Sequence, residues 1–235
     1  MDGSEEPDLS WRKLRAVAFL NQQIKWIAAL PGALGAMAAL SACGCFQPKA
    51  CTDCVVLVGD SITANWQDLA TGRELAGLKI VNRGIPSDVT AHMLTRFDKE
   101  VTRIRPRVVV VLGGINDFER VPLSSTEQNL EAMAERAARN DIRVVLATLP
   151  PVGLSTDERD PSASILAQDA GRDKIRVLND WIKDFAARKQ YTLVDYHSAL
   201  TDDRGFYLKG LTSDGIHPSA QGYERMERLL SEAIR

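Results

Sequence analysis

Five residues of the chain have the types that an acyl-transfer site needs: Ser61, Gly84, Asn116, Asp214 and His217. The hydroxyl of Ser61 can attack a carbonyl carbon if a neighbouring imidazole, such as that of His217, takes its proton. Asp214 lies three residues before His217 and can hold the imidazole in one tautomer. The backbone amides of Ser61 and Gly84 and the side-chain amide of Asn116 can donate hydrogen bonds to an oxyanion. The set therefore indicates hydrolysis by a serine nucleophile.

Short apolar runs alternate with amphipathic runs after residue 54, which is typical of an α/β fold with a parallel sheet. The apolar runs predict strands over residues 55–58, 78–82, 107–112, 142–148 and 191–194. The amphipathic runs predict helices over residues 61–70, 87–103 with Ser87 as N-cap, 124–140, 173–189 and 219–235, and residues 150–171 predict a polar surface loop. Because ligands of such folds bind beyond the carboxyl ends of the strands, the residues that follow the strands are expected to form the site.

Four motifs follow one another in a fixed order: Gly59-Asp60-Ser61, then Gly84, then Gly113-Gly114-Ile115-Asn116-Asp117, then Asp214-Gly215-Ile216-His217. They resemble the motifs of the SGNH hydrolases, the GDSL esterase/lipase family. The resemblance implies a flavodoxin-like three-layer α/β/α sandwich with a central five-stranded parallel sheet, and hydrolysis of carboxylic esters without a metal or other cofactor. It implies Ser61, Asp214 and His217 as the triad, and Ser61, Gly84 and Asn116 as oxyanion donors. Two departures, Asn65 where many members have glycine and Gly-Gly-Ile-Asn-Asp in the third motif, bear on substrate shape.

Other polar and aromatic residues near the motifs have two readings each. His197 follows Asp195 at the end of the last expected strand and is a second candidate base, although the resemblance favours His217. His92 falls within an expected helix and is interpreted as a surface or packing residue. Asp60 either braces the nucleophile turn or borders the pocket, and Trp66 either lines the pocket or belongs to the core.

The first 42 residues predict a lipoprotein-type signal peptide. Basic residues precede an apolar run over residues 26–40, and Leu40-Ser41-Ala42-Cys43 resembles a lipobox with Cys43 as the lipidated residue. Acidic residues near the start fit this poorly, so an uncleaved N-terminal anchor or an extra amphipathic helix is the alternative. A lipid-anchored location in the cell envelope follows from the first reading, and a cytoplasmic location follows if the segment is no signal.

The other three cysteines, Cys45, Cys51 and Cys54, fall in an expected linker over residues 43–54 that precedes the hydrolase domain, residues 55–235. Outside the cytoplasm we expect one disulfide among them and one remaining thiol. A zinc site is the weaker alternative, because three thiols without a nearby histidine make an incomplete ligand set.

Charge and composition limit the partners. With 29 Lys+Arg against 31 Asp+Glu, a formal charge of −2 and 6% aromatic residues, the chain lacks the features of a nucleic-acid binder. The expected partner is a small-molecule, glycan or lipid ester, and only the N-terminal anchor would contact a membrane. Esters with short acyl chains are the expected substrates. The alternatives are O-deacetylation of an acetylated polysaccharide, thioester or lysophospholipid hydrolysis, and a non-enzymatic lipoprotein that binds glycans or lipids.

Overall fold

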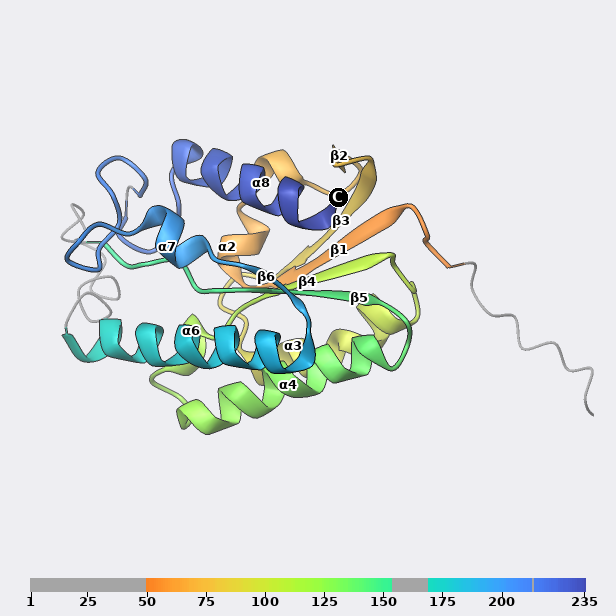
Figure 1. The fold of residues 1–235 in the computed structure, drawn as a ribbon, viewed down its shortest axis with the longest axis horizontal. Coiled ribbons are helices and arrows are strands. Elements are labelled where there is room, and N and C mark those ends of the chain that lie inside the picture. The colour runs from red at the N-terminus through yellow and green to blue at the C-terminus, as the bar shows by residue number, and fades with distance from the viewer. Residues whose placement is uncertain (1–49, 154–168, 213) are drawn as a thin grey trace, which may run out of the picture. The chain divides into compact units, whose positions relative to one another are not determined.

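The computed structural model describes residues 50–153, 169–212 and 214–235, and its centre is a β-sheet. The strands of this part of the chain pair in the order β2-β3-β1-β4-β5-β6 (Figure 1). Their bounds are β1 Cys54–Gly59, β2 Glu74–Leu75, β3 Leu78–Gly84, β4 Val108–Leu112, β5 Arg143–Ala147 and β6 Thr192–Val194. The pairs β3–β1, β1–β4, β4–β5 and β5–β6 are all parallel, which confirms the predicted five-stranded parallel sheet.

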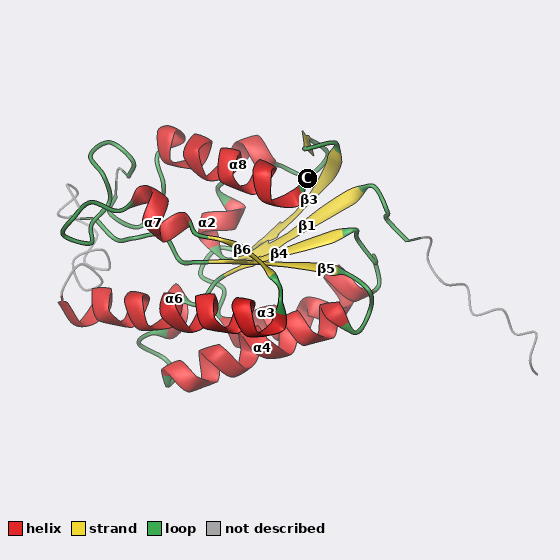
Figure 2. Cartoon of the chain, viewed as in Figure 1, coloured by secondary structure: helices red, strands yellow, loops and turns green. Residues whose placement is uncertain are grey.

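The central strands are apolar along their whole length because helices cover both of their faces. Every residue of β1 and β4 is buried. Helices α2 (Ser61–Ala64) and α8 (Ala220–Ile234) lie on one face of the sheet. Helices α3 (Thr90–Phe97), α4 (Leu123–Ala138) and α6 (Asp169–Lys189) lie on the other (Figures 1 and 2). This is the predicted three-layer arrangement, with the flavodoxin-like strand order.

Two short elements, β2 and α7 (Tyr196–Leu200), were not predicted from the sequence. Strand β2 pairs antiparallel with the start of β3 through a tight turn in which both Ala76 and Gly77 have positive φ, at 50° and 78°. Helix α7 follows β6 directly and begins at Asp195, whose carboxylate accepts a hydrogen bond from the amide of Ser198. Elements of two and five residues carry too little periodicity to be recognised in sequence.

Three predicted helices begin or end elsewhere, and one of them, α6, begins at Asp169 instead of residue 173, inside the predicted loop. The helix expected over residues 61–70 breaks after Ala64 and resumes as a 3₁₀ turn over Gln67–Leu69. The side-chain amide of Asn82 donates to the carbonyls of Thr63 and Leu69 across this break. The second helix begins at Thr90 rather than after Ser87 and continues into a π-helical segment, Asp98–Thr102.

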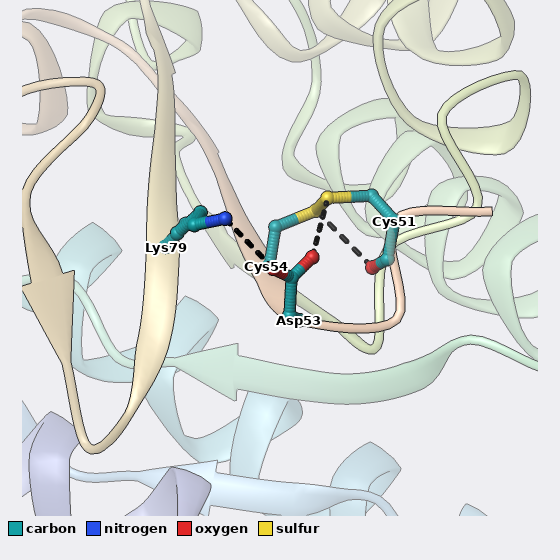
Figure 3. The surroundings of a disulfide bond; sticks show 4 residues. All are labelled: Cys51, Asp53, Cys54 and Lys79. Carbon is teal, nitrogen blue, oxygen red and sulfur yellow. Dashed lines mark hydrogen bonds and ion pairs between the residues drawn. A yellow bond between two sulfur atoms is a disulfide. The ribbon is translucent and has the colours of Figure 1, made fainter. Parts of the chain in front are cut away.

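A disulfide joins Cys51 to Cys54 at the amino end of β1, and beside it Lys79 pairs with Asp53 at 2.9 Å (Figure 3). The amide of Cys51 donates to the carbonyl of Ile104, and the amide of Arg107 donates to the carbonyls of Cys51 and Cys54. Residues 51–54 therefore pack with the domain, and the first strand begins one residue before the predicted boundary. Residues 1–42, Cys43 and Cys45 lie outside the described residues. Within the described part of the chain, no helix has both the length and the apolar character of a membrane span.

Candidate active site

The motif residues gather at the carboxyl ends of three adjacent strands. Ser61 begins the helix that follows β1, Gly84 ends β3, and Asn116 lies in the 3₁₀ turn Ile115–Asp117 after β4. The sheet order places β1 between β3 and β4, and Gly59 of β1 is level with both Gly84 and Leu112. After β1 the chain places β3 on one side of it and β4, β5 and β6 on the other side. Open α/β sheets bind ligands at the point where the strand order changes direction in this way.

A chain of two hydrogen bonds connects the nucleophile candidate to an acid. The Nε2 atom of His217 lies 2.8 Å from Oγ of Ser61, and its Nδ1 atom lies 2.7 Å from Oδ2 of Asp214. The other oxygen of Asp214 accepts hydrogen bonds from the amides of Ile216 and His217, at 2.8 and 2.7 Å. The carboxylate is thus held from two sides, and the imidazole is aimed at Ser61.

The hydrogen bonds also keep Asp214 ionised. Burial alone would raise the pKa of this carboxyl, but the bonds from the His217 ring and from the two amides outweigh burial, so its pKa lies below the usual value. An ionised Asp214 accepts a hydrogen bond from the Nδ1–H of His217 and so leaves Nε2 free to accept the proton of Ser61. This is the tautomer that a general base requires.

The loop before α8 fixes His217. Gly215 has φ of 88°, a left-handed conformation that suits glycine. The hydroxyl of Thr212 accepts a hydrogen bond from the amide of Gly215 and donates one to the carbonyl of His217. The amide of Gly153 adds a third bond, to the carbonyl of Gly215, at 2.7 Å. The backbone around the imidazole is therefore tied on both sides.

Asp60 and Trp66 are both buried, which favours one of the two interpretations given for each: Asp60 braces the nucleophile turn, and Trp66 belongs to the core. Asp60 is fully buried, and its carboxylate caps α2 by accepting the amide of Ile62 at 2.9 Å. Burial raises the pKa of Asp60 to about 7, against the lowering effects of that bond and of His217. Trp66 is 3% exposed and packs against the rings of Tyr196 and Tyr223.

Two oxyanion donors have suitable surroundings. Ser61 is the first residue of α2, so its amide has no intrahelical acceptor. One N–H of the Asn116 side chain donates to the carbonyl of Asp88 at 2.9 Å, which orients the amide and leaves its second N–H available. Asp117 stabilises this turn, because its buried carboxylate accepts the amide of Thr90 at the start of α3.

Gly84 differs from the expectation. Its amide donates to Oδ1 of Asn82 at 2.9 Å and is therefore already engaged. The glycine is required for another reason: a Cβ atom at this position would lie 2.2 Å from the amide nitrogen of Ala64. Gly84 thus allows the end of β3 to approach the helix that carries Ser61.

Ser87 is a candidate donor that the sequence analysis missed, since it was interpreted as a helix cap. It has φ of 61°, and its amide has no acceptor among the described residues. It is exposed and immediately precedes Asp88, whose carbonyl orients Asn116. Nothing in the residue type distinguishes Ser87 in the sequence, because a serine before a helical pattern reads as an N-cap.

Comparison with known proteins identifies the family. Residues 57–225 match the model of the GDSL-like Lipase/Acylhydrolase family. The chain belongs to this family. It is a hydrolase that acts on esters. Esterase TesA of Pseudomonas aeruginosa is 30% identical over 49% of this chain and 67% of the esterase.

Solved structures agree with this assignment. A GDSL-like lipase from Bacteroides thetaiotaomicron is 27% identical, with a TM-score of 0.64 over 77% of this chain and 87% of the lipase. An acetylxylan esterase from Geobacillus stearothermophilus has the same fold, with a TM-score of 0.59 at 19% identity over 79% of this chain and 95% of the esterase.

In this GDSL-like hydrolase the structure places His197 in a separate environment. Its Nδ1 atom lies 3.2 Å from the hydroxyl of Thr201, and burial lowers its pKa. Asp195 is bound by Lys183 at 2.7 Å and by the hydroxyl of Ser198 at 2.6 Å. The third histidine, His92, has an exposed side chain beside Asp88. The structure thus brings His217, and not His197, to Ser61.

The described residues of this hydrolase contain no group of three or more His, Cys, Asp or Glu side chains that could hold a metal ion. Two clefts of about 400 and 390 Å³ lie elsewhere: the first at the amino ends of the strands beside Arg105 and Asn140, the second beside His197 and Arg204. The Ser61–His217 pair lies outside both clefts, and the side chain of His217 is 30% exposed.

Proposed function

We propose that the protein is a serine esterase that hydrolyses carboxylic esters with short acyl chains. Ser61 acts as the nucleophile, His217 as the general base and acid, and Asp214 as the group that orients the imidazole. The observation that carries this proposal is the continuous chain of hydrogen bonds from Ser61 through His217 to Asp214. It lies where the carboxyl ends of β3, β1 and β4 meet.

The geometry supports the following reaction. Oγ of Ser61 attacks the ester carbonyl carbon while its proton moves to Nε2 of His217. The negative charge that develops on the carbonyl oxygen is bound by the amides of Ser61 and Ser87 and by the side chain of Asn116. The intermediate collapses to an acyl-Ser61, and His217 gives its proton to the leaving alcohol. Water activated by His217 then attacks the acyl group, and Ser61 leaves with the returned proton.

We expect esters with short acyl chains to be the better substrates. The protein sequence has no extended apolar insertion between its motifs that could form a lid over a long acyl chain, and residues 150–171 are largely polar. Acetyl esters of sugars are a related substrate class, so O-deacetylation of an acetylated polysaccharide stays the second candidate. This second candidate is supported by the fold that the chain shares with an acetylxylan esterase.

The test uses the full chain and p-nitrophenyl esters of acetate, butyrate and dodecanoate, together with acetylated xylo-oligosaccharides. We expect the acetate and butyrate esters to be hydrolysed fastest. Ser61→Ala is expected to abolish the activity while thermal unfolding stays within a few degrees of the wild type. Full activity in Ser61→Ala would overturn the mechanism. Faster release of acetate from the oligosaccharide than from the small ester would favour the second candidate.

We also propose that Cys43 carries a lipid anchor that holds the enzyme in the cell envelope, on the strength of the lipobox-like sequence. The full chain is expected to partition into detergent when expressed in bacteria, and the Cys43→Ser variant is expected to remain unprocessed. Recovery of the unlipidated wild-type chain from the cytosol would exclude the anchor.

A further inference from the structure

One guanidinium contacts three of the segments that surround the nucleophile. Arg96 lies in α3, which covers the face of the sheet opposite to α2, and its side chain is 13% exposed. We propose that Arg96 is a positioning residue of the oxyanion site: it holds the donors of the oxyanion in register with Ser61 without touching the substrate. The inference rests on the proposed esterase function.

The first two contacts join the ends of two strands. Nη2 of Arg96 donates to the carbonyl of Gly59 at 3.1 Å, and Nη1 donates to the carbonyl of Arg83 at 2.8 Å. Gly59 is the last residue of β1 and lies two positions before Ser61, while Arg83 precedes Gly84 at the end of β3. The carbonyl of Gly59 also accepts the amide of Ile85 at 3.1 Å. Arg96 therefore fixes the start of the turn over residues 84–88 against the nucleophile strand.

The third contact holds the other end of the same turn. Nε of Arg96 donates to Oδ2 of Asp88 at 2.9 Å, and the side chain of Asp88 is only 5% exposed. The backbone carbonyl of Asp88 accepts the side chain of Asn116 at 2.9 Å. Asp88 thus connects Arg96 to two of the proposed donors. It is hydrogen-bonded to the side chain of Asn116, and it is the next residue in the chain after Ser87, whose amide is the second of these donors.

Only arginine can make this set of contacts. Its planar guanidinium carries five N–H donors in fixed directions, whereas a lysine ammonium is a point charge on a flexible stem. The positive charge also offsets the buried carboxylate of Asp88, and it is shared with Glu100, which contacts Nη1 on the outer side. A lysine at position 96 would keep the charge but not the geometry.

The consequence concerns kcat. Oxyanion donors act only if they point to where charge develops, and a displacement of about 1 Å can lower a rate on the order of a hundredfold. Without Arg96 the turn over residues 84–88 loses one contact at each of its ends, and the bond from the amide of Ile85 to the carbonyl of Gly59 remains. We expect Arg96→Ala and Arg96→Lys to lower kcat roughly tenfold to a hundredfold, with less than about a threefold change in KM.

The matched control is Arg143→Ala. The guanidinium of Arg143 also binds backbone carbonyls, those of Ala233, Ile234 and Arg235 at the end of α8, but it lies at the start of β5, at the opposite end of the strands. Its loss is expected to lower the free energy of unfolding without lowering kcat, measured well below the unfolding temperature. If Arg96→Ala does not fold, Arg96→Lys and Asp88→Asn carry the test, since Asp88→Asn keeps the carbonyl that orients Asn116.

A double-mutant cycle separates positioning from general stability. If Arg96 acts through the oxyanion donors, Arg96→Ala will lower kcat by a much smaller factor in the Asn116→Ala background than in the wild type. An equal factor in both backgrounds, or a wild-type kcat in Arg96→Lys, would refute the inference. The proposed function is judged separately by Ser61→Ala: if that variant is inactive while the Arg96 variants are fully active, only the positioning role fails.

Discussion

The Nε2 atom of His217 lies 2.8 Å from Oγ of Ser61, although the two residues are 156 positions apart in the chain. Helix α8 begins three residues after His217, and its Tyr223 donates a hydrogen bond to the carbonyl of Ile62, the second residue of α2. The ring of Tyr223 packs on Trp66 at 5.4 Å between ring centroids. Docking of the C-terminal helix on the nucleophile's helix therefore brings the base to the nucleophile.

The first prediction distinguishes the two acid–histidine pairs. His217→Ala is expected to lower kcat nearly as much as Ser61→Ala, because nucleophile and base act as one unit. Asp214→Ala should also lower kcat strongly, but by a smaller factor, since water can partly replace a group that only orients. His197→Ala is expected to keep most of its activity. Measurement of kcat for the three variants, with unfolding curves for each, tests the assignment.

The structural reason for the contrast is the sheet order. His197 follows β6 at the edge, and β4 and β5 lie between β6 and β1. An inactive but natively folded His197→Ala, beside an active His217→Ala, would reverse the two assignments.

The second prediction concerns the side chain of Asn116. Asn116→Ala should lower kcat on the order of a hundredfold, the effect expected for loss of one oxyanion donor. Asn140→Ala is the control, because the side-chain amide of Asn140 likewise donates to a backbone carbonyl, that of Arg136, at 2.8 Å, but at the exposed C-terminal end of α4. Its kcat should equal that of the wild type. Equal kcat values in the two variants would show that Asn116 is not an oxyanion donor.

The parallel sheet could be predicted because its strands are short runs of apolar residues. β4 reads Val-Val-Val-Val-Leu, and such a run needs cover on both faces wherever it lies in the fold. That the residues after β1 and β4 lie close together could also be predicted, since these two strands are neighbours and run parallel, so that their carboxyl ends meet. The two-residue strand β2 could not, because it is specified by the turn at Ala76 and Gly77 and not by a pattern of its own.

The oxyanion site could be predicted only in part. A glycine after a strand suggests a free backbone amide, but in the fold the amide of Gly84 donates its hydrogen bond to the side chain of Asn82. That contact depends on the rotamer of Asn82 and on the break after Ala64, which no local pattern encodes. The proposed role of Arg96 is hidden for a similar reason, because two of its partners are backbone carbonyls at the ends of two strands, and a carbonyl leaves no signature in sequence.

The third prediction concerns substrates and metal. Hydrolysis of p-nitrophenyl esters should be faster for acyl chains of two to four carbons than for chains of about twelve, and EDTA should leave the rate unchanged because the proposed mechanism uses only side chains and amides. Purified enzyme, assayed with both ester classes before and after EDTA, gives the comparison. A preference for the long chain, or inhibition that added metal reverses, would contradict it.

The fourth prediction concerns the disulfide. The bond joins residues only three positions apart, and the chain-entropy model gives a loop of about four residues a stabilisation of about 2 kcal/mol. Cys51→Ala should lower the free energy of unfolding by about that amount, while kcat is unchanged because the bond lies at the amino end of β1. Reduction of the wild type with dithiothreitol should give a similar loss. A fall in kcat in the folded variant would show that the bond acts on the site.

The fifth prediction follows from the burial of Asp60. Burial raises the pKa of Asp60 from 3.8 to about 7. The folded protein therefore holds a proton on this carboxyl that the unfolded chain releases near pH 4, so this group lowers stability as pH rises from about 4 to about 7. At about 1.4 kcal/mol for each pKa unit, the destabilisation above pH 7 is at most about 4 kcal/mol. An asparagine at this position can still cap α2 but does not titrate.

Urea unfolding of the wild type and Asp60→Asn between pH 4.5 and pH 8 measures this effect. The free energy of unfolding of Asp60→Asn should rise relative to that of the wild type across the interval. Asp195→Asn is the control: Asp195 also caps a helix, but its bonds to Lys183 and Ser198 outweigh burial and lower its pKa to about 2. The stability that this ionised group contributes is lost only on acidification below about pH 4, so the difference between Asp195→Asn and the wild type should stay constant from pH 4.5 to pH 8. If the difference in unfolding free energy between Asp60→Asn and the wild type is also constant with pH, the prediction is wrong. Asp60 would then be ionised in the folded protein throughout this range, with a neighbouring group compensating for the burial of its charge.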